Sequence, residues 1–397
     1  MKRRSFGAGV IVSAALLMAA CGAPPVPVSP TVQAPTAAVQ APAPTGAPAA
    51  ATAAAKPAAP TAVPPTPVAV QAPTAPAGAL KLHLGLTTSP PPPQPNAVLW
   101  LARDRGFYQA EGLDVDLQEV QATPSVVTAM RTGDIDVGSI ATQDVLSLTA
   151  GNALQLRAIG SQEGQTHFVV VAREGINSVD ELKGKSFGIA RPGSVDDSLS
   201  RLVLSAQGLD PSSMTFVAVG APNLRIQAML AGQLDATTTS IGNWVTLQSQ
   251  KGIHLLVDEK TYFAAAPIVQ KVTVVKADAL QQKPEALRRF TAALIKASGY
   301  FANDKQAWIE AMQARRPDVS VGDLGGIWEQ TRGSWPVNGG FNPDQYQKTA
   351  EFLYATDDFK ALPRLELSTW AATGLVDSVL KELGVDSTLD PPGREIP

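Results

Sequence analysis

The chain has 397 residues and a formal net charge of −3, so it lacks the basic surface that nucleic-acid binding requires. Its one cysteine, Cys21, stands near the N-terminus, which excludes disulfides, thiolate metal sites and cysteine nucleophiles from the rest of the chain. The three histidines, His83, His167 and His254, have no partner at the spacing of a metal site, and we expect no cofactor.

Residues 1–20 have the pattern of a bacterial export signal. Positions 2–4 are basic, and the apolar stretch 6–20 is too short to span a bilayer. Small residues before Cys21 resemble a lipobox, although Met18 stands where leucine is usual. We therefore expect cleavage after residue 20 and a lipid on Cys21 that anchors the protein to the outer face of the cytoplasmic membrane. Ordinary signal cleavage is the alternative, and the choice between Sec and twin-arginine export stays open.

Residues 21–79 have a composition that cannot form a core. They are almost entirely Ala, Pro, Thr, Val and Gln, with Lys56 as their one charged residue. Too little apolar surface is available to offset the entropy of folding. We expect a disordered tether between the membrane and a folded body. Loss of the signal removes three positive charges and leaves a net charge of −6.

The folded body begins with an alternation of strands and helices. The pattern predicts strands at 81–86, 111–120 and 134–138, and helices at 96–105 and 124–132. Asn96 can cap the first helix, and Gly106 and Gly133 are suited to end the two helices. This order is that of a βαβαβ unit.

The same order returns about a hundred residues later. Strands are predicted at 185–190 and 214–219, with a helix at 194–206 between them. The segment AMRTGDID at 129–136 is echoed by AMLAGQLD at 228–235. A chance likeness of helix ends is the alternative to duplication. We expect an α/β protein with two lobes of the same plan.

Two apolar, β-branched segments, 166–172 and 267–276, are predicted to be the hinge strands that cross between the lobes. Lobe 1 is then 80–171 with 268–397, and lobe 2 is 172–267. The C-terminal part of lobe 1 is helical, with helices predicted at 284–303, 305–315, 322–333, 343–353 and 375–383. A ligand site is expected in the cleft between the lobes, beyond the carboxyl ends of the strands.

Enzyme signatures are weak. The tripeptide at 184–186 resembles the end of a P-loop, but it precedes a strand and lacks the earlier glycine. No G-x-S-x-G nucleophile elbow occurs. Asp134 and Asp136 have the context of solvated turn residues. A binding protein is therefore favoured over an enzyme.

Four loops that follow strands are predicted to face the cleft, at 87–94, 138–143, 189–197 and 237–244. They carry small and hydroxyl residues whose following helices present free N–H groups. Helix capping is the alternative role for each loop, and a core position is the alternative for the tryptophan. The candidate ligand-binding residues are Ser89, Ser139, Thr142, Gln143, Ser161, Gly193, Ser194, Asp196, Thr239, Ser240, Asn243 and Trp244.

From about residue 80 to 383 the chain resembles the solute-binding proteins of bacterial ABC importers, in the branch that binds aliphatic sulfonates, taurine, nitrate or pyrimidine thiamine precursors. The resemblance rests on RGFYQAEGLDVD at 105–116, MRTGDIDVG at 130–138, DELKGKSFGI at 180–189 and GLDP at 208–211. It implies the two-lobed periplasmic-binding-protein (type II) fold with two hinge strands. It also implies a monomer that delivers solute to a permease driven by a cytoplasmic ATPase.

Two other functions stay open beside transport. One is a tethered ligand sensor, and the other is a pyrimidine-synthase-like enzyme. Related synthases use a cysteine-rich motif and histidine, and the folded part of this chain has no cysteine. The sequence SIGN at 240–243 stands where relatives often have an aromatic residue followed by Glu/Asp-Pro, so their ligand specificity does not transfer directly.

The helix expected after Gly193 bears on the charge of the ligand. With Ser194 as N-cap, Asp196 and Asp197 lie in the first turn, and Ser194 and Asp197 match a capping box. These carboxylates occupy free N–H groups and repel an anion. We therefore favour a neutral or nitrogen-rich heterocycle such as a pyrimidine, stacked near Trp244 and donating to Asp196. Alternatively, both aspartates face solvent, Arg191 neutralises them and a sulfonate binds.

Overall fold

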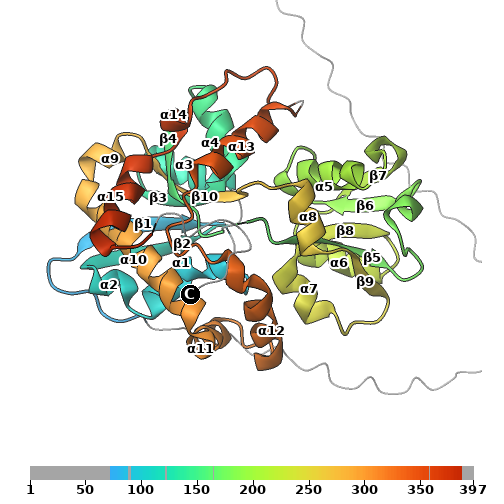
Figure 1. Cartoon of the computed structure of the whole chain (residues 1–397), viewed down its shortest axis with the longest axis horizontal. Helices are drawn as coiled ribbons and strands as arrows, with labels where there is room; N and C mark the ends of the chain where they lie inside the picture. The colour runs from blue at the N-terminus through green and yellow to red at the C-terminus, as the bar shows by residue number, and fades with distance from the viewer. Residues whose placement is uncertain (1–71, 88–90, 121–122, 164, 357, 387–397) are drawn as a thin grey trace, which may run out of the picture. The chain divides into compact units, whose positions relative to one another are not determined.

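The computed structural model describes residues 72–87, 91–120, 123–163, 165–356 and 358–386, which belong to one structural unit. The expected export signal, Cys21, most of the expected tether and Ser89 lie outside these residues. No helix among the described residues is long and apolar enough to cross a membrane. The protein has an α/β fold with two five-stranded sheets, each the centre of one lobe (Figure 1).

The first sheet has the strand order β2-β1-β3-β10-β4. Its central strands are parallel, and β10 runs antiparallel to both of its neighbours. The strands are β1 (Leu80–Leu86), β2 (Leu113–Glu119), β3 (Val137–Ala141), β4 (Leu156–Gly160) and β10 (Lys271–Lys276). Between them lie η1 (Pro95–Ala97), α1 (Val98–Asp104), α2 (Phe107–Ala110), α3 (Thr123–Thr132) and α4 (Thr142–Ala150).

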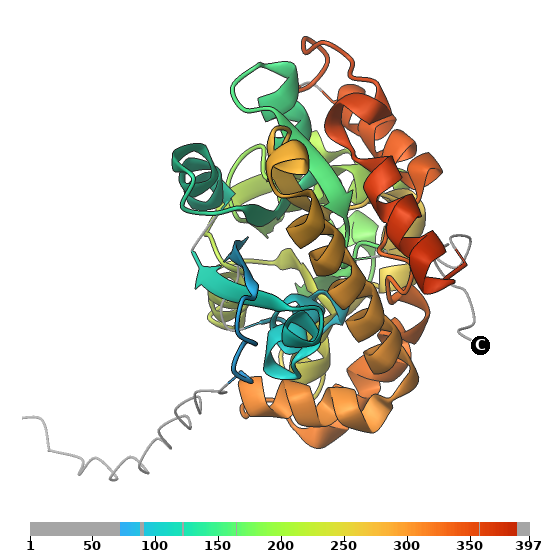
Figure 2. The same cartoon turned by 90° about the vertical axis from the view of Figure 1, so that its left-hand side faces the viewer.

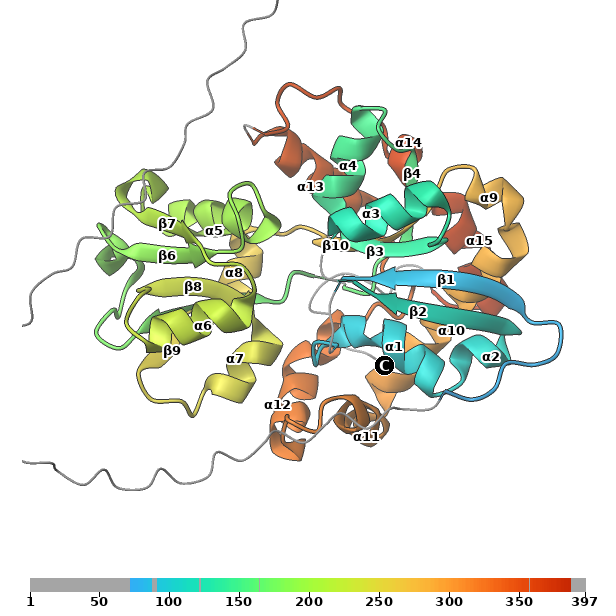
Figure 3. The ribbon, with the colours of Figure 1, turned by 180° about the vertical axis from the view of Figure 1, so that it is seen from behind.

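The second sheet has the order β7-β6-β8-β5-β9, with β5 antiparallel to its neighbours (Figure 3). Its strands are β5 (Phe168–Arg173), β6 (Ser186–Ile189), β7 (Thr215–Ala218), β8 (Ala236–Ser240) and β9 (Ile253–Val257). Its helices are η2 (Val179–Leu182), α5 (Val195–Ala206), η3 (Pro211–Ser213), α6 (Pro222–Leu230), α7 (Ile241–Leu247) and α8 (Glu259–Ala265).

The two sheets repeat one topology. Taken in order, the strands β2, β1, β3, β10 and β4 of the first sheet correspond to β7, β6, β8, β5 and β9 of the second. The chain crosses between the sheets twice, after β4 and before β10. The strands that complete these crossings, β5 and β10, are the antiparallel fourth strands of their sheets. The predicted fold with two hinge strands and duplicated lobes is therefore confirmed.

The echoed segments perform the same structural task in both lobes. Asp136 Oδ2 accepts from the His83 N–H at 3.0 Å, and Asp235 Oδ2 accepts from the Ser186 N–H at 2.9 Å. Each aspartate therefore accepts from a backbone N–H of the neighbouring parallel strand, β1 or β6. Partial burial raises the pKa of Asp235, but its hydrogen bonds to Ser186 and Arg173 lower the pKa by more. The pKa therefore lies below the ordinary value.

The aliphatic residue of each echoed segment packs onto a glycine. A Cβ on Gly85 would lie 2.5 Å from Ile135 Cδ1, and a Cβ on Gly188 would lie 2.6 Å from Leu234 Cδ1. Both glycines leave room for that side chain against the sheet. These local contacts explain why the repeated letters coincide with repeated geometry.

The C-terminal helices follow β10 and pack mainly on the first sheet and its helices, and α12 also contacts α7. They are α9 (Ala279–Gln282), α10 (Pro284–Asn303), α11 (Lys305–Arg315), α12 (Val321–Thr331), η4 (Arg332–Ser334), α13 (Pro343–Tyr354), α14 (Leu367–Trp370) and α15 (Thr373–Leu383). Helix α15 lies beside α10, as Figure 2 shows in red and brown-orange. Alternate strand residues face separate hydrophobic clusters, so helices cover both faces of the first sheet.

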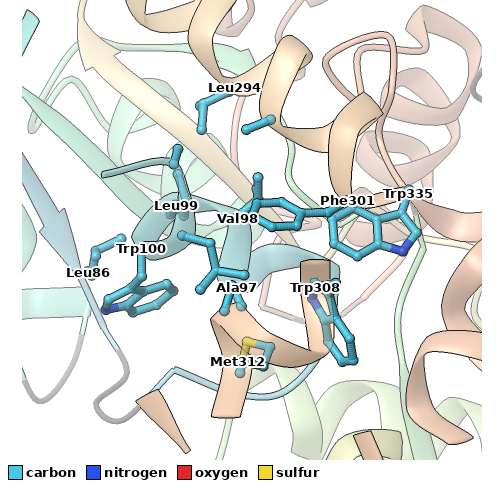
Figure 4. Close-up of a cluster of buried hydrophobic side chains, with 14 of the residues drawn as sticks. Leu86, Ala97, Val98, Leu99, Trp100, Leu294, Phe301, Trp308, Met312 and Trp335 are labelled. Carbon is cyan, nitrogen blue, oxygen red and sulfur yellow. The ribbon is translucent and has the colours of Figure 1, made fainter. Parts of the chain in front are cut away.

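A cluster of aromatic side chains joins α1 to the C-terminal helices (Figure 4). Phe301 and Trp335 have ring centroids 6.2 Å apart, and Trp335 meets Trp308 edge-on at 6.3 Å. Phe301 lies between Val98 and Trp335 in the close-up. This packing holds η1 and α1, which follow the first strand, in a fixed position.

One predicted helix cap is wrong. Asn96 lies inside η1, and α1 begins at Val98 with Ala97 as its N-cap and no side-chain capping bond. The side chain of Asn96 donates instead to Glu163. A buried partner 67 residues away therefore takes precedence over the local cap.

Candidate functional site

The two lobes contact each other where α4 and α5 begin. Gln143 Nε2 donates to the Gly193 carbonyl at 3.3 Å, which joins two of the predicted cleft loops. Burial raises the pKa of Asp144, which follows Gln143, and Arg191 of the other lobe partly offsets this rise. A cavity of about 650 Å³ lies beside Gly193, between α5 and the end of α13.

A second contact lies at the start of α7. A Cβ on Gly242 would lie 3.1 Å from the Pro93 carbonyl oxygen, so lobe 2 touches the turn before η1 here. Helix α7 also packs on α12 of the first lobe, where Val245 approaches Gly326. Ser240 caps α7 by accepting from the Asn243 N–H at 3.2 Å. The loop 237–244 therefore meets lobe 1, and its hydroxyl residue also caps the helix.

Several candidate residues make contacts within the fold. Thr142 Oγ1 donates to the Val269 carbonyl at 2.6 Å, and Ser161 Oγ lies 2.7 Å from the Lys271 carbonyl. Thr239 is buried in β8 and accepts from Asn243 Nδ2 at 3.2 Å. Ser139 is buried in β3 opposite Thr273. Of these side chains, Thr142 and Ser161 bond to the segment 269–271 that leads into β10, and Thr239 bonds to α7.

The start of α5 differs from the predicted capping box. Ser194 is the N-cap, but its side chain caps no helix N–H and bonds to the Arg191 carbonyl at 2.6 Å. Asp197 Oδ2 reaches back to the Gly193 N–H at 2.9 Å, one residue before the position that a capping box requires. The conformation of Gly193, with φ of +69°, places its N–H there.

Asp196 is satisfied by donors of the protein itself. Its carboxylate accepts from the Ala190 N–H at 2.9 Å, from Ser194 Oγ at 2.7 Å and from buried Arg225. Asp197 pairs with Arg201 at 2.7 Å. The positive partners of these aspartates are therefore Arg225 and Arg201, and not Arg191.

Trp244 is half-buried and packs against the hydrophobic cluster that α7 shares with α12. Its ring is therefore partly covered by that cluster.

Sequence reasoning missed a buried polar cluster made by Gln94, Asn96 and Glu163. Gln94 and Asn96 are each 6% exposed, and Glu163 is 3% exposed. Both amides donate to Glu163 Oε1, with Gln94 at 3.4 Å. Glu163 lies on the crossing between the sheets, while the amides flank the start of η1 next to Pro93. One sequence signal was available: Glu163 is the only Asp, Glu, Lys or Arg residue between Arg157 and Arg173.

His167 bridges the lobes at the same crossing. Its Nδ1 lies 2.5 Å from Glu259 Oε1 of α8, and its Nε2 lies 3.2 Å from Ser334 Oγ of η4. Both ring nitrogens thus have protein partners, in keeping with the core role favoured for the histidines. Within the described residues, no group of His, Cys, Asp and Glu side chains could hold a metal ion.

A family model described as NMT1/THI5 like matches residues 95–307, which is more than half of the chain. The matched range includes all of the second sheet. The chain belongs to the NMT1/THI5 like family. This family assignment confirms the resemblance inferred from the sequence motifs.

Relatives of this NMT1/THI5 like protein include binding proteins and an enzyme. A Brucella abortus relative is 26% identical over 213 residues, and the match covers 52% of this chain and 64% of the relative. The taurine-binding periplasmic protein of Escherichia coli is 24% identical over 56% of this chain and 70% of its own length. The 4-amino-5-hydroxymethyl-2-methylpyrimidine phosphate synthase of Schizosaccharomyces pombe is 32% identical over 34% of this chain and 39% of the enzyme.

Solved structures share the fold. A Bordetella bronchiseptica protein superposes with a TM-score of 0.64 at 19% identity, covering 77% of this chain and 98% of the other. The alkanesulfonate-binding protein of Xanthomonas axonopodis pv. citri, bound to MOPS, superposes with a TM-score of 0.56 at 19% identity, covering 76% of this chain and all of the other. At these identities the likeness extends to the architecture of periplasmic binding proteins.

Proposed function

We propose that this NMT1/THI5 like protein is the solute-binding component of an ABC importer. It captures a small organic solute between its lobes and delivers it to a membrane permease driven by a cytoplasmic ATPase. The lobes are 80–171 with 268–397, and 172–267. The observation that carries this proposal is the pair of equivalent sheets joined by two crossings, with polar side chains gathered at the first crossing.

The proposed site lies where the crossing, η1, and the starts of α4, α5 and α7 approach one another. Contacts across the lobes support it: Gln143 meets Gly193, and Pro93 meets Gly242. Such contacts form when a hinged protein closes, and a bound solute stabilises the closed form by its differential affinity. The taurine-binding relative supports a small polar ligand.

An enzyme is the second candidate, because the fission yeast relative is a pyrimidine phosphate synthase. The synthases that this chain resembles use a cysteine-rich motif, and Cys21 is the only cysteine of this chain. Binding without chemistry is therefore the function that we propose. A tethered sensor would bind solute in the same way, and solute transfer to a permease separates the two.

Closure tests the proposal. Full-length protein carrying Cys21→Ser, which keeps it free of lipid, is titrated with taurine, ethanesulfonate, nitrate and 4-aminopyrimidine. We expect a solute that binds to reduce the radius of gyration in X-ray scattering, because the lobes approach. The variant Gln143→Ala should bind about 3- to 10-fold more weakly, since it loses a contact between the lobes. Gln347→Ala, a change at an exposed residue of α13, is the control. Saturation by a tight ligand without any change in scattering contradicts the proposal.

We further propose that the protein is exported and anchored by lipid on Cys21, with residues 21–79 as its tether. A single acyl chain binds a membrane only weakly, and firm anchoring needs more than one. The lipid of a lipoprotein carries several such chains. In cells, Cys21→Ser should release the protein from the membrane fraction or leave its signal uncleaved. Fractionation with immunoblotting measures both outcomes. A serine variant that is processed and membrane-bound like the original chain overturns the anchor.

A further inference from the structure

We propose that the solute presents an amino, amidino or ammonium group to Glu163, and that nitrate and sulfonates without such a nitrogen are poor ligands. The proposal rests on the solute-binding function proposed above. It names the chemical class that the buried cluster of Gln94, Asn96 and Glu163 selects.

Glu163 is a buried carboxylate without a cation. It is 3% exposed, and no Lys, Arg or His of the described residues lies within 4.0 Å of it. Its backbone is held by Ser161, whose Oγ accepts from the Glu163 N–H at 3.1 Å. Lys271, whose carbonyl also contacts Ser161 Oγ, directs its Nζ to Thr87 Oγ1 at 3.2 Å. The backbone of Glu163 is therefore held in place, and no cationic side chain of the described residues pairs with its carboxyl group.

The orientation of the two amides follows from this carboxylate. Both NH₂ groups face Glu163 Oε1, since turning either amide over would set its oxygen against a carboxylate oxygen. Three acceptor atoms then remain buried without a partner among the described residues: Glu163 Oε2, Gln94 Oε1 and Asn96 Oδ1. Buried acceptors of this kind are unfavourable unless a donor from outside the protein completes them.

A nitrogen that carries several hydrogens completes such a set. An ammonium offers three donors, and an amidine or an aminopyrimidine offers two or more in one plane. An anion placed about 5 Å from Glu163 would instead meet a repulsion that lowers its affinity on the order of 100-fold. The adjacent contact of Pro93 with Gly242 shows how lobe 2 reaches this position. The cluster therefore selects donors and disfavours anions.

Two matched pairs of compounds test the assignment by calorimetry with the full-length Cys21→Ser protein. Taurine is compared with isethionate, which replaces its ammonium with a hydroxyl, and 4-aminopyrimidine with 4-methylpyrimidine. In each pair that binds, we expect the compound with the nitrogen donor to bind more tightly. Glu163→Gln should lower the affinity for that compound about 10- to 100-fold. Glu310→Gln, a change at an exposed residue of α11, is the control.

The ligand-free protein provides a second readout that needs no ligand. Because no cationic side chain pairs with the buried carboxyl group of Glu163, Glu163→Gln should raise the melting temperature of the ligand-free protein by about 3 °C. Glu310→Gln should leave this temperature unchanged. A lower or unchanged melting temperature means that the carboxylate serves the fold, and it overturns the proposal.

The outcomes separate the two proposals. Closure around isethionate or nitrate, with equal affinity in Glu163→Gln, overturns the donor assignment and leaves solute binding standing. Failure of all these compounds to close the lobes counts against solute binding, and the melting temperature of Glu163→Gln then decides the assignment of the carboxylate.

Discussion

Replacing Arg225 with methionine should lower the free energy of unfolding by about 3–5 kcal/mol. Arg225 is 3% exposed and pairs with Asp196, which also accepts from the Ala190 N–H and Ser194 Oγ. Without Arg225 the carboxylate is left buried with neutral donors only, and the cost of its desolvation is no longer offset. Urea unfolding followed by circular dichroism measures the loss.

Two further variants make this measurement specific. Arg225→Met with Asp196→Asn should recover about half of the loss, because the asparagine carries no charge while it still accepts hydrogen bonds. Arg201→Met is the comparison, since Arg201 is 42% exposed and water still reaches its side chain, although it also stacks on Phe216. Its removal should cost about 1–2 kcal/mol, less than that of Arg225. Equal effects of Arg225→Met and Arg201→Met would show that the buried pair has no special role.

Replacing Gly340 with alanine should lower the free energy of unfolding by about 3–5 kcal/mol and weaken solute binding. The residue has a φ of +62°, and an added Cβ would lie 2.0 Å from the carbonyl oxygen of Ser161. Ser161 begins the first crossing between the sheets and holds the backbone of Glu163. The backbone must therefore shift at the hinge to admit one methyl group.

Gly384→Ala is the control for this variant. Gly384 ends α15 with a φ of +66°, and an added Cβ there meets no atom within 4 Å. It should cost about 1–2 kcal/mol from the backbone conformation alone and leave solute affinity unchanged. Thermal unfolding and calorimetry compare the two variants. If both alanines have the same effect, the close approach at the hinge does not constrain the structure.

The order of elements and most of their bounds could be predicted from the sequence. Helices α10 and α11 occupy the predicted residues 284–303 and 305–315, because their start and stop signals act within a few residues. The duplication was visible for the same reason: the Gly-x-aliphatic-Asp turn acts on the strand beside it in each lobe. The C-terminal helices and the two crossings followed from periodicity and β-branched content.

The site could be predicted only as a set of loops. Two candidate hydroxyl residues, Thr142 in one of these loops and Ser161 outside them, bond to backbone carbonyls more than a hundred residues away. Local patterns suggested helix N-termini for these loops, but the same residue types also hold strands and crossings together. Helix capping was therefore indistinguishable from ligand binding in the sequence.

By itself the sequence determined the α/β class, the repeated order of elements and the position of the crossings, since each depends on composition or on neighbours within a few residues. Tertiary structure alone decided which polar side chains meet. Arg225 reaches Asp196 across 29 residues, and Asn96 reaches Glu163 across 67. No periodicity encodes such pairs, because they depend on how the finished sheets and helices place side chains in space. The same packing made Asp196 internal and left Glu163 without a cation.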